Sequence, residues 1–212
     1  IERQIGGSFW PPDLQIIGKD ILRFHAVIWP AMLLALGFGA KENADSHTLP
    51  DKLFVHGFFT VNGQKMAKSA GNFITIKDVL KKFTADDVKL FFLSAHYTSS
   101  VDFSFDALAD AHTALERCDV LFWKAAEILK SDEHTASHQR DFIERNKNKF
   151  LEAMDDDFNT PQALASIFEL VNITNKNIDD PEFIFEAKVL LYNLADRLGL
   201  NLSRYVIVKA EV

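Results

Sequence analysis

A β-hairpin signal followed by helical patterning indicates how this chain is organised. Residues 52–61, KLFVHGFFTV, are rich in strand-forming residues, and Asn62-Gly63 follows them directly. Both central residues of a type I′ turn have positive φ, which Asn and Gly tolerate, so this dipeptide predicts a hairpin. After Asn72 the patterning becomes helical. We therefore expect strands in the first part of the chain and helices in the remainder.

A strand followed by a helix is expected upstream of the hairpin. The run LQIIG, residues 14–18, is short, apolar and ends in glycine, which is typical of a buried parallel strand. The next stretch is apolar on nearly all faces, which predicts an interior helix that begins at Asp20, kinks at Pro30 and ends at Gly37, before a polar loop over residues 38–51. Its apolar run is too short and too broken by Gly and Pro to span a bilayer. Strand plus helix is half of a βαβ unit and predicts the tail of an α/β domain.

Helix-start and helix-stop signals divide the rest of the chain. Thr75-x-x-Asp78 and Thr84-x-x-Asp87 are capping-box patterns ahead of apolar runs. The helices expected after them cover residues 104–130, 139–154, 161–176 and 182–198, with Thr160 as N-cap and Pro161 as first residue of the third, and Gly199 closing the last. The polar break over residues 131–138 separates the first two. The predicted fold class is mainly α with an α/β portion, and the helices form an antiparallel bundle.

Composition excludes several classes of protein. The 212 residues allow one large domain or two small ones, and a hydrophobic content of 48% excludes a disordered chain. The single cysteine, Cys118, excludes an internal disulfide framework and a thiolate zinc site, and it fits a reducing compartment. A formal net charge of −7 argues against a polyanionic partner, although only the local field at a docking face decides that point.

Two lysines stand between the hairpin and the helices. The stretch GQKMAKSAGN, residues 63–72, places Lys65 and Lys68 three positions apart among small residues. The hairpin turn should expose this loop, and its two ammonium groups could close over a bound polyphosphate. The alternative is a solvated surface loop with two ordinary lysines.

The lysine loop resembles a family signature. KMAKS, with Ala67 at its centre, differs by one residue from KMSKS, the second signature of class I aminoacyl-tRNA synthetases, and FVHGFFTVNGQKMAKSAGN resembles the same region of methionyl- and cysteinyl-tRNA synthetases. The resemblance implies that Lys65 and Lys68 hold the triphosphate of ATP, with its Mg²⁺, during adenylate formation. It further implies the end of a Rossmann-type catalytic domain over residues 1–60, a connecting segment carrying the loop over 61–103, and an anticodon-binding-like helical bundle over 104–212.

The segment before the hairpin resembles methionyl-tRNA synthetases. IIGKDILRFHAVIWPAMLLALG implies that Phe24 and His25 line a methionine pocket, and an apolar, polarisable pocket suits a thioether. Cysteinyl enzymes have here a Gly-rich turn and a His-His-Glu string that helps bind zinc, and neither is present, so no metal site is assigned. The alternatives are that His25 is a hydrogen-bonded histidine on a buried helix and that Asp20 is a plain N-cap. The resemblance implies ATP-binding roles for Gly18, Lys19, Asp20, Lys65, Met66, Lys68 and Ser69.

The second half of the chain resembles cysteinyl-tRNA synthetases instead. The stretches NFITIKDVLKKF, LSAHYTSSVDFS and AMDDDFNTPQALA carry this likeness, and the Asn-Leu-x-x-Arg-like anticodon pattern of methionyl enzymes is not found in residues 104–130. The acids at 155–157 indicate a solvated helix end. The basic clusters at 77–82 and 145–149 likewise indicate solvated helix faces.

These resemblances lead to a methionine–tRNA ligase as the main interpretation. Its expected partners are tRNA, methionine and ATP. No association with a membrane is expected, and its expected location is the cytoplasm. A cysteine–tRNA ligase and a non-catalytic tRNA-binding or interaction module derived from a synthetase are the alternatives. The first signature of the family, HIGH-like, is not found, so we expect the N-terminal half of the catalytic domain to be missing and this chain alone to be inactive.

Overall fold

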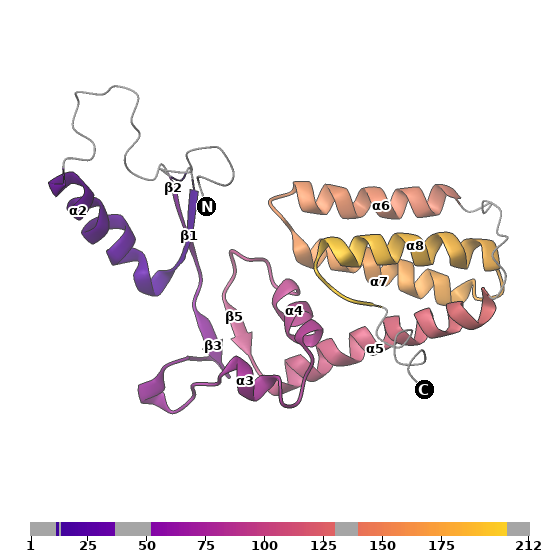
Figure 1. Cartoon of the computed structure of the whole chain (residues 1–212), viewed down its shortest axis with the longest axis horizontal. Coiled ribbons are helices and arrows are strands. Elements are labelled where there is room, and N and C mark those ends of the chain that lie inside the picture. Colours follow the sequence, from indigo (N-terminus) through magenta and orange to yellow (C-terminus); the bar gives the residue numbers. More distant parts are fainter. Residues whose placement is uncertain (1–11, 13, 37–51, 130–139, 203–212) are drawn as a thin grey trace, which may run out of the picture. The chain divides into compact units, whose positions relative to one another are not determined.

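The chain folds into two compact units. The computed structural model describes residues 12, 14–36, 52–129 and 140–202. A strand unit comprises residues 1–65 and 97–102, and a helical unit comprises 66–96 and 103–212 (Figure 1). Small sheets and many helices confirm the predicted fold class, mainly α with an α/β portion. The predicted domain boundaries after residues 60 and 103 stay a prediction.

The strand unit contains the predicted parallel pair. β1, Leu14–Gly18, pairs in parallel with β2, Lys52–His56, so that Ile16 lies opposite Phe54. The prediction that β1 is buried is wrong for most of the strand, because Ile17 is buried while Leu14 and Ile16 are 51% and 58% exposed. Parallel sheets normally need cover on both faces, and the described residues leave part of this strand uncovered.

The segment after β1 is helical but irregular. A 3₁₀ turn, Lys19–Ile21, and a π-helical turn, Phe24–Ile28, precede α2, Trp29–Ala35. The helix is irregular just before Pro30, where Trp29 N–H donates to the Phe24 carbonyl, five residues back, and the proline itself has no N–H to donate. The predicted kink at Pro30 stays a prediction. The predicted interior helix is wrong, since only Leu33 of α2 is buried. Gly37 and the predicted loop over 38–51 lie outside the described residues.

The predicted hairpin is confirmed. β3, Phe59–Val61, pairs antiparallel with β4, Gln64–Lys65, and β5, Val101–Phe103, lies on the other side of β3. Asn62 and Gly63 have φ of 50° and 75°, as a type I′ turn requires. The Asp102 carboxylate accepts hydrogen bonds from the Thr60 hydroxyl at 2.6 Å and the Gly63 N–H at 2.8 Å. These bonds fix the turn against β5.

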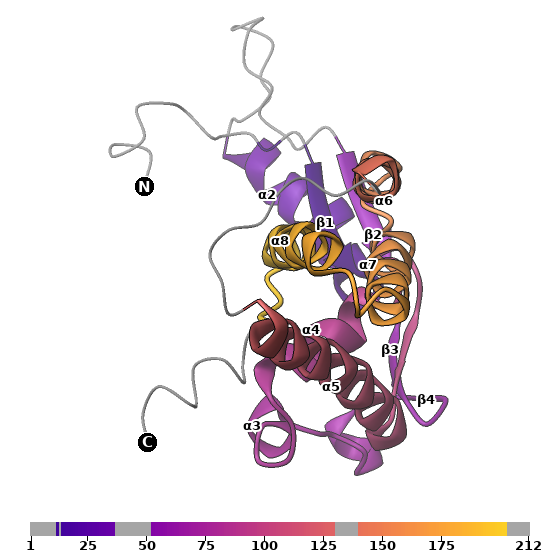
Figure 2. The same cartoon turned by 90° about the vertical axis from the view of Figure 1, so that its right-hand side faces the viewer.

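The helical unit is a bundle with short helices before it. Its elements are α3, Ile76–Val79; α4, Ala85–Leu93; α5, Phe105–Ile128; α6, Arg140–Asp155; α7, Thr160–Lys176; and α8, Pro181–Arg197. Helices α7 and α8 lie side by side between α6 and α5 (Figures 1 and 2). Apolar side chains from α5 to α8 fill the space between the helices, and Leu108, Leu170 and Leu191 are completely buried.

Capping residues set the ends of these helices much as predicted. The side chains of Thr75 and Thr84 accept hydrogen bonds from the N–H groups of Asp78 and Asp87. Gly199 follows α8 with φ of 69°, as its closing role requires. The predicted cap of α7 is wrong by one residue: Asn159, not Thr160, accepts the capping bond, from Gln162 N–H. Asn and Thr are both good caps, so the sequence alone does not separate them.

Candidate functional site

The KMAKS loop is held by its own backbone and by one amide side chain. Lys65 ends β4, and Lys68 begins a 3₁₀ turn, Lys68–Ala70. The Asn72 side-chain oxygen accepts a hydrogen bond from Ala67 N–H at 2.9 Å, and Gly71 has φ of 70°. Lys65, Ser69, Ala70 and Gly71 are exposed, while Met66 and Ala67 are half-buried. The boundary between the two units falls directly after Lys65.

Lys65 belongs to a small charged cluster in the strand unit. Its ammonium forms an ion pair with the Asp20 carboxylate, and the Lys65 Nζ lies 4.7 Å from the centroid of the Phe58 ring. The Lys19 Nζ lies 5.3 Å from the same centroid. Both are cation–π contacts, which are strongest when the cation is partly desolvated. Two of the predicted ATP-binding residues, Lys19 and Lys65, thus contact one aromatic ring, and a third, Asp20, pairs with Lys65.

Phe58 is the residue that sequence reasoning missed. It is one of several aromatic residues in KLFVHGFFTV, and no local pattern distinguishes it from Phe54 or Phe59. Its carbonyl accepts a hydrogen bond from Val101 N–H at 3.3 Å, which anchors the backbone next to β3. Recognising its role requires knowing that β1 and β4 end near each other within the strand unit.

Asp20 is not a helix N-cap, which was the alternative to its predicted ATP-binding role. Gly18 is the residue before the 3₁₀ turn, and no side chain caps that turn. The Asp20 carboxylate pairs with Lys65 instead, and both side chains are 55% exposed. Gly18 lies close to β2, since a Cβ atom on it would be 3.4 Å from Nε2 of His56. The turn after β1 is thereby held against the neighbouring strand.

Phe24 and His25 occupy the π-helical turn. The His25 Nδ1 donates a hydrogen bond to the Ile21 carbonyl at 3.0 Å, and its ring packs edge-on against Trp29 at 6.2 Å between centroids. His25 is therefore hydrogen-bonded, as the alternative to a pocket role predicts. The helix around it is mostly exposed, whereas that alternative predicts a buried helix. Phe24 is 57% exposed, so the described part of the chain does not by itself enclose an amino-acid pocket around this pair.

The basic clusters lie on solvated helix faces, and the acidic residues Asp155, Asp156 and Asp157 are exposed. Lys81 pairs with Asp78 at 2.7 Å, Lys147 with Glu144 at 3.1 Å, and Lys149 with Glu169 at 2.7 Å, all on exposed side chains. Each of these three lysines thus has an acid beside it. Within the ranges that the structure describes, no three His, Cys, Asp or Glu side chains come close enough to hold a metal ion. None of the helices described there is both long and apolar enough to cross a membrane.

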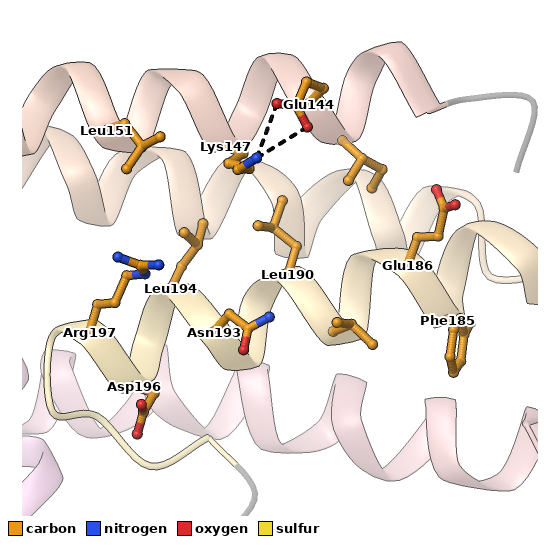
Figure 3. A pocket seen from close by; sticks show the side chains of 12 residues that line it. Glu144, Lys147, Leu151, Phe185, Glu186, Leu190, Asn193, Leu194, Asp196 and Arg197 are labelled. Atoms are coloured by element: carbon orange, nitrogen blue, oxygen red, sulfur yellow. Dashed lines mark hydrogen bonds and ion pairs between the residues drawn. The ribbon is translucent and has the colours of Figure 1, made fainter. Parts of the chain in front are cut away.

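The helical unit also carries a groove of about 710 Å³ along α6 and α8. Leu190 and Leu194 point from α8 toward α6, and the Glu144–Lys147 ion pair lies on the α6 side (Figure 3). The remaining lining residues are Ile143, Leu151, Phe185, Glu186, Val189, Asn193, Asp196 and Arg197. No residue of the KMAKS loop takes part in it.

Comparison with protein families tests whether the chain is related to the synthetases that its lysine loop resembles. A family described as "tRNA synthetases class I (M)" matches residues 7–114, which includes β1, the charged cluster and the KMAKS loop. The chain belongs to the class I tRNA synthetases. A second family, the DALR domain, matches residues 149–203, from the last part of α6 through all of α7 and α8. The class I synthetase resemblance is thus confirmed.

Curated relatives of this class I chain are cysteine–tRNA ligases. The enzyme of Pseudothermotoga lettingae is 41% identical over 146 residues, covering 66% of this chain and 31% of the relative. That of Geobacter metallireducens is 40% identical over 168 residues, covering 74% and 35%. The chain therefore spans about a third of the length of these relatives.

Solved structures share the fold at low identity. Mycobacterium tuberculosis methionyl-tRNA synthetase bound by methionyl-adenylate matches 90% of this chain and 41% of its own, with a TM-score of 0.64 and 24% identity. An Agrobacterium radiobacter LeuRS in a ternary complex with tRNA and LeuAMS matches 95% of this chain and 27% of its own, with a TM-score of 0.70 and 19% identity. At these identities the likeness concerns the fold alone.

Proposed function

We propose that the protein containing this chain is an aminoacyl-tRNA ligase that activates an amino acid with ATP and transfers it to tRNA. The observation that carries the proposal is the KMAKS loop of a class I chain, with Lys65 set beside Lys19 and Asp20 in one exposed cluster. Membership of the class I family and the DALR match support ATP and tRNA as ligands.

The proposed chemistry needs cations where charge develops. Attack of the amino-acid carboxylate on the ATP α-phosphate builds negative charge on the departing pyrophosphate. Lys65 and Lys68 would stabilise that charge, and losing one such donor in a water-excluded site typically costs ~3–4 kcal/mol. Met66 and Ser69 lie between and beside them in the loop and remain proposed ATP contacts, as does Gly18 in the turn after β1.

We infer cysteine, rather than the methionine expected from the sequence, as the amino acid. The cysteine–tRNA ligases described above are about 40% identical to this chain, whereas the methionyl-tRNA synthetase structure is 24% identical. Methionine remains the second candidate, because Phe24 and His25 stand where the sequence resembles methionyl enzymes and the family description carries the letter M.

Zinc, which the resemblance to cysteinyl enzymes implies, does not fit the residues beside His25. Ala26 and Val27 follow it, and neither can ligate a metal. The His25 Nδ1 donates to the Ile21 carbonyl, which leaves Nε2 as the one ring nitrogen able to ligate, but no group of three His, Cys, Asp or Glu side chains that could hold a metal is found among the described residues. No step of the proposed reaction is therefore assigned to zinc.

Amino-acid-dependent pyrophosphate exchange on the full-length protein tests the proposal. Exchange with cysteine at low concentration supports our inference, and exchange with methionine alone replaces it by the second candidate. Exchange with none of the twenty amino acids, together with salt-sensitive tRNA binding, would instead identify the non-catalytic binding module, because phosphate contacts give a steep salt dependence.

A further inference from the structure

The ion pair between Asp20 and Lys65 places an acid next to a lysine that the proposed function assigns to a polyphosphate. We propose, on the basis of that function, that Asp20 is a positioning residue. Its carboxylate pairs with the Lys65 ammonium when no nucleotide is bound, and this pair breaks when Lys65 binds the polyphosphate. Asp20 is then the resting partner of Lys65, and the anion must compete with it.

The backbone brings the two side chains together from distant parts of the sequence. Asp20 lies in the 3₁₀ turn directly after β1, and the β1–β2 pairing fixes where that turn begins. Lys65 lies at the end of β4, which the β3 pairing and the Asp102 hydrogen bonds to the hairpin turn hold in place. Each side chain therefore stands at or next to the end of a hydrogen-bonded strand.

Phe58 brings a second cation into the cluster around Lys65. Lys19 and Lys65 both lie within about 5 Å of its ring centroid, at 5.3 and 4.7 Å, so two positive charges share one aromatic ring. Like charges in such an arrangement repel each other. The Asp20 carboxylate reduces this repulsion in the absence of ligand, and Phe58 keeps the cations near each other.

Exposure makes the pairing reversible. The Lys65 and Asp20 side chains are each 55% exposed, and ion pairs of this kind are weak because water screens them. A triphosphate carries several negative charges against the single charge of Asp20, so it attracts the ammonium more strongly. Releasing Lys65 should consequently weaken polyphosphate binding by only about two- to fivefold relative to a protein without Asp20, the scale of an exposed pair.

Tripolyphosphate is the appropriate probe because it carries the polyphosphate charge of ATP without the nucleoside, so that any other contact of Asp20 with ATP does not enter the measurement. Its dissociation constant is measured by titration calorimetry on the full-length protein, on Asp20→Asn, on Lys65→Met and on the double variant. Glu144→Gln is the matched control: it makes the same charge change at an exposed ion pair, with Lys147 on α6. Asp20→Glu tests whether the pairing can be restored by a longer acid.

We expect Asp20→Asn to tighten tripolyphosphate binding, with a gain about two- to fivefold larger in the presence of Lys65 than in the Lys65→Met background. Asp20→Glu should return the affinity toward that of the unmodified protein, and Glu144→Gln should leave it unchanged. An equal gain in both backgrounds would overturn the inference, because it would reflect simple repulsion of the anion by Asp20. Weaker binding by Asp20→Asn would overturn it as well.

The proposed function is judged separately from this inference. If Lys65→Met binds tripolyphosphate as tightly as the unmodified protein, Lys65 does not contact the polyphosphate. Asp20 and the polyphosphate then do not compete for its ammonium group. Pyrophosphate exchange would still report whether the protein is a ligase, since it depends on the whole site. Exchange that persists while the coupling between Asp20 and Lys65 is absent rejects the inference alone.

Discussion

The Asp87 carboxylate accepts a hydrogen bond from the Nδ1 of His112 at 3.1 Å and so joins α4 to α5. Asp87 is completely buried, and its other oxygen accepts from the Thr84 N–H at 2.7 Å to close the capping box at the start of α4. The Nε2 of His112 lies 3.5 Å from Glu116 on the next turn of α5. One carboxylate therefore serves a helix cap and an inter-helix contact together.

Asp87→Ala should destabilise the helical unit. The substitution removes the capping box and leaves the Thr84 N–H and His112 without their buried acceptor, so we expect the free energy of unfolding to fall by about 2–3 kcal/mol. Denaturant unfolding followed by circular dichroism measures this. Asp78→Ala is the control, because Asp78 holds the same position beside the Thr75 cap but is exposed, and it should cost about 1 kcal/mol or less. Equal losses for the two variants would argue against the role of burial.

Acid should weaken the same contact. Burial raises the pKa of Asp87, but hydrogen bonds from the Thr84 backbone, the Thr84 hydroxyl and His112 outweigh burial and hold this pKa below its ordinary value of 3.8. A lowered carboxyl pKa contributes stability that is present above 3.8 and is lost as the pH falls through the lower folded-state value. We expect the unfolding free energy to decrease below pH 4 and to decrease less in Asp87→Asn. Parallel pH profiles for the two proteins would contradict this.

Gly57→Ala should disturb the strand unit. A Cβ atom at position 57 would lie 2.8 Å from the backbone nitrogen of Ser100, and a backbone atom cannot move aside as a flexible side chain can. We expect a loss of about 1–3 kcal/mol, the usual cost of overpacking, and faster hydrogen exchange in β2 and β3. Ser100→Gly should not restore the variant, because the clash with the Ser100 backbone remains. Full restoration would show that only the hydroxyl is in the way.

The exposed apolar side chains of β1 and the following helical segment predict the behaviour of the isolated 212-residue chain. Ile16, Phe24, Val27 and Met32 are each more than half exposed, which is unusual for a contiguous apolar stretch in water. We expect this chain to bind a hydrophobic dye and to form no adenylate. Ile16→Asn should reduce the dye fluorescence, whereas Val120→Asn, on an exposed face of α5, should reduce it less. Measurable turnover by the isolated chain would refute the expectation.

Local signals account for most of what the sequence predicted correctly. Asn62-Gly63 and Thr84-x-x-Asp87 act through φ preferences and hydrogen bonds within a few residues, so no tertiary information is needed to interpret them. The cap of α7 was misplaced by one residue because Asn159 and Thr160 both favour that role. The all-round apolar character of the segment after β1 predicts burial, but composition shows how much apolar surface a segment carries and not what covers it.

The contacts of the candidate site could be predicted only in part. The resemblance identified Lys65 and Asp20 individually, but their ion pair joins residues 45 positions apart. It exists because β1 pairs with β2 and β3 pairs with β4, and a single sequence does not specify how those strand ends meet. Phe58 was missed for the same reason. Site residues that a family signature names are therefore accessible from sequence, whereas the groups that orient them require the structure.

Lys68→Ala tests the loop more directly than any other substitution. Lys68 is the second lysine of KMAKS, in a short turn followed by Gly71 with positive φ. A lysine that meets the pyrophosphate as charge builds stabilises the transition state more than bound ATP, so its loss should lower kcat and leave the KM for the amino acid nearly unchanged. In the full-length protein we expect pyrophosphate exchange to slow by roughly a hundredfold or more.

Two further variants, Lys65→Ala and Lys124→Ala, serve as comparisons for the Lys68→Ala exchange rate. Lys65→Ala should slow exchange less than Lys68→Ala, because Lys65 is partly committed to Asp20 before the nucleotide binds. Lys124→Ala removes an exposed lysine from α5, outside the loop, and should leave exchange within about twofold. The three rates are compared at saturating ATP and amino acid. A Lys68→Ala protein as fast as Lys124→Ala would mean that the loop lysines are ordinary surface residues, and the polyphosphate role proposed for KMAKS would have to be abandoned.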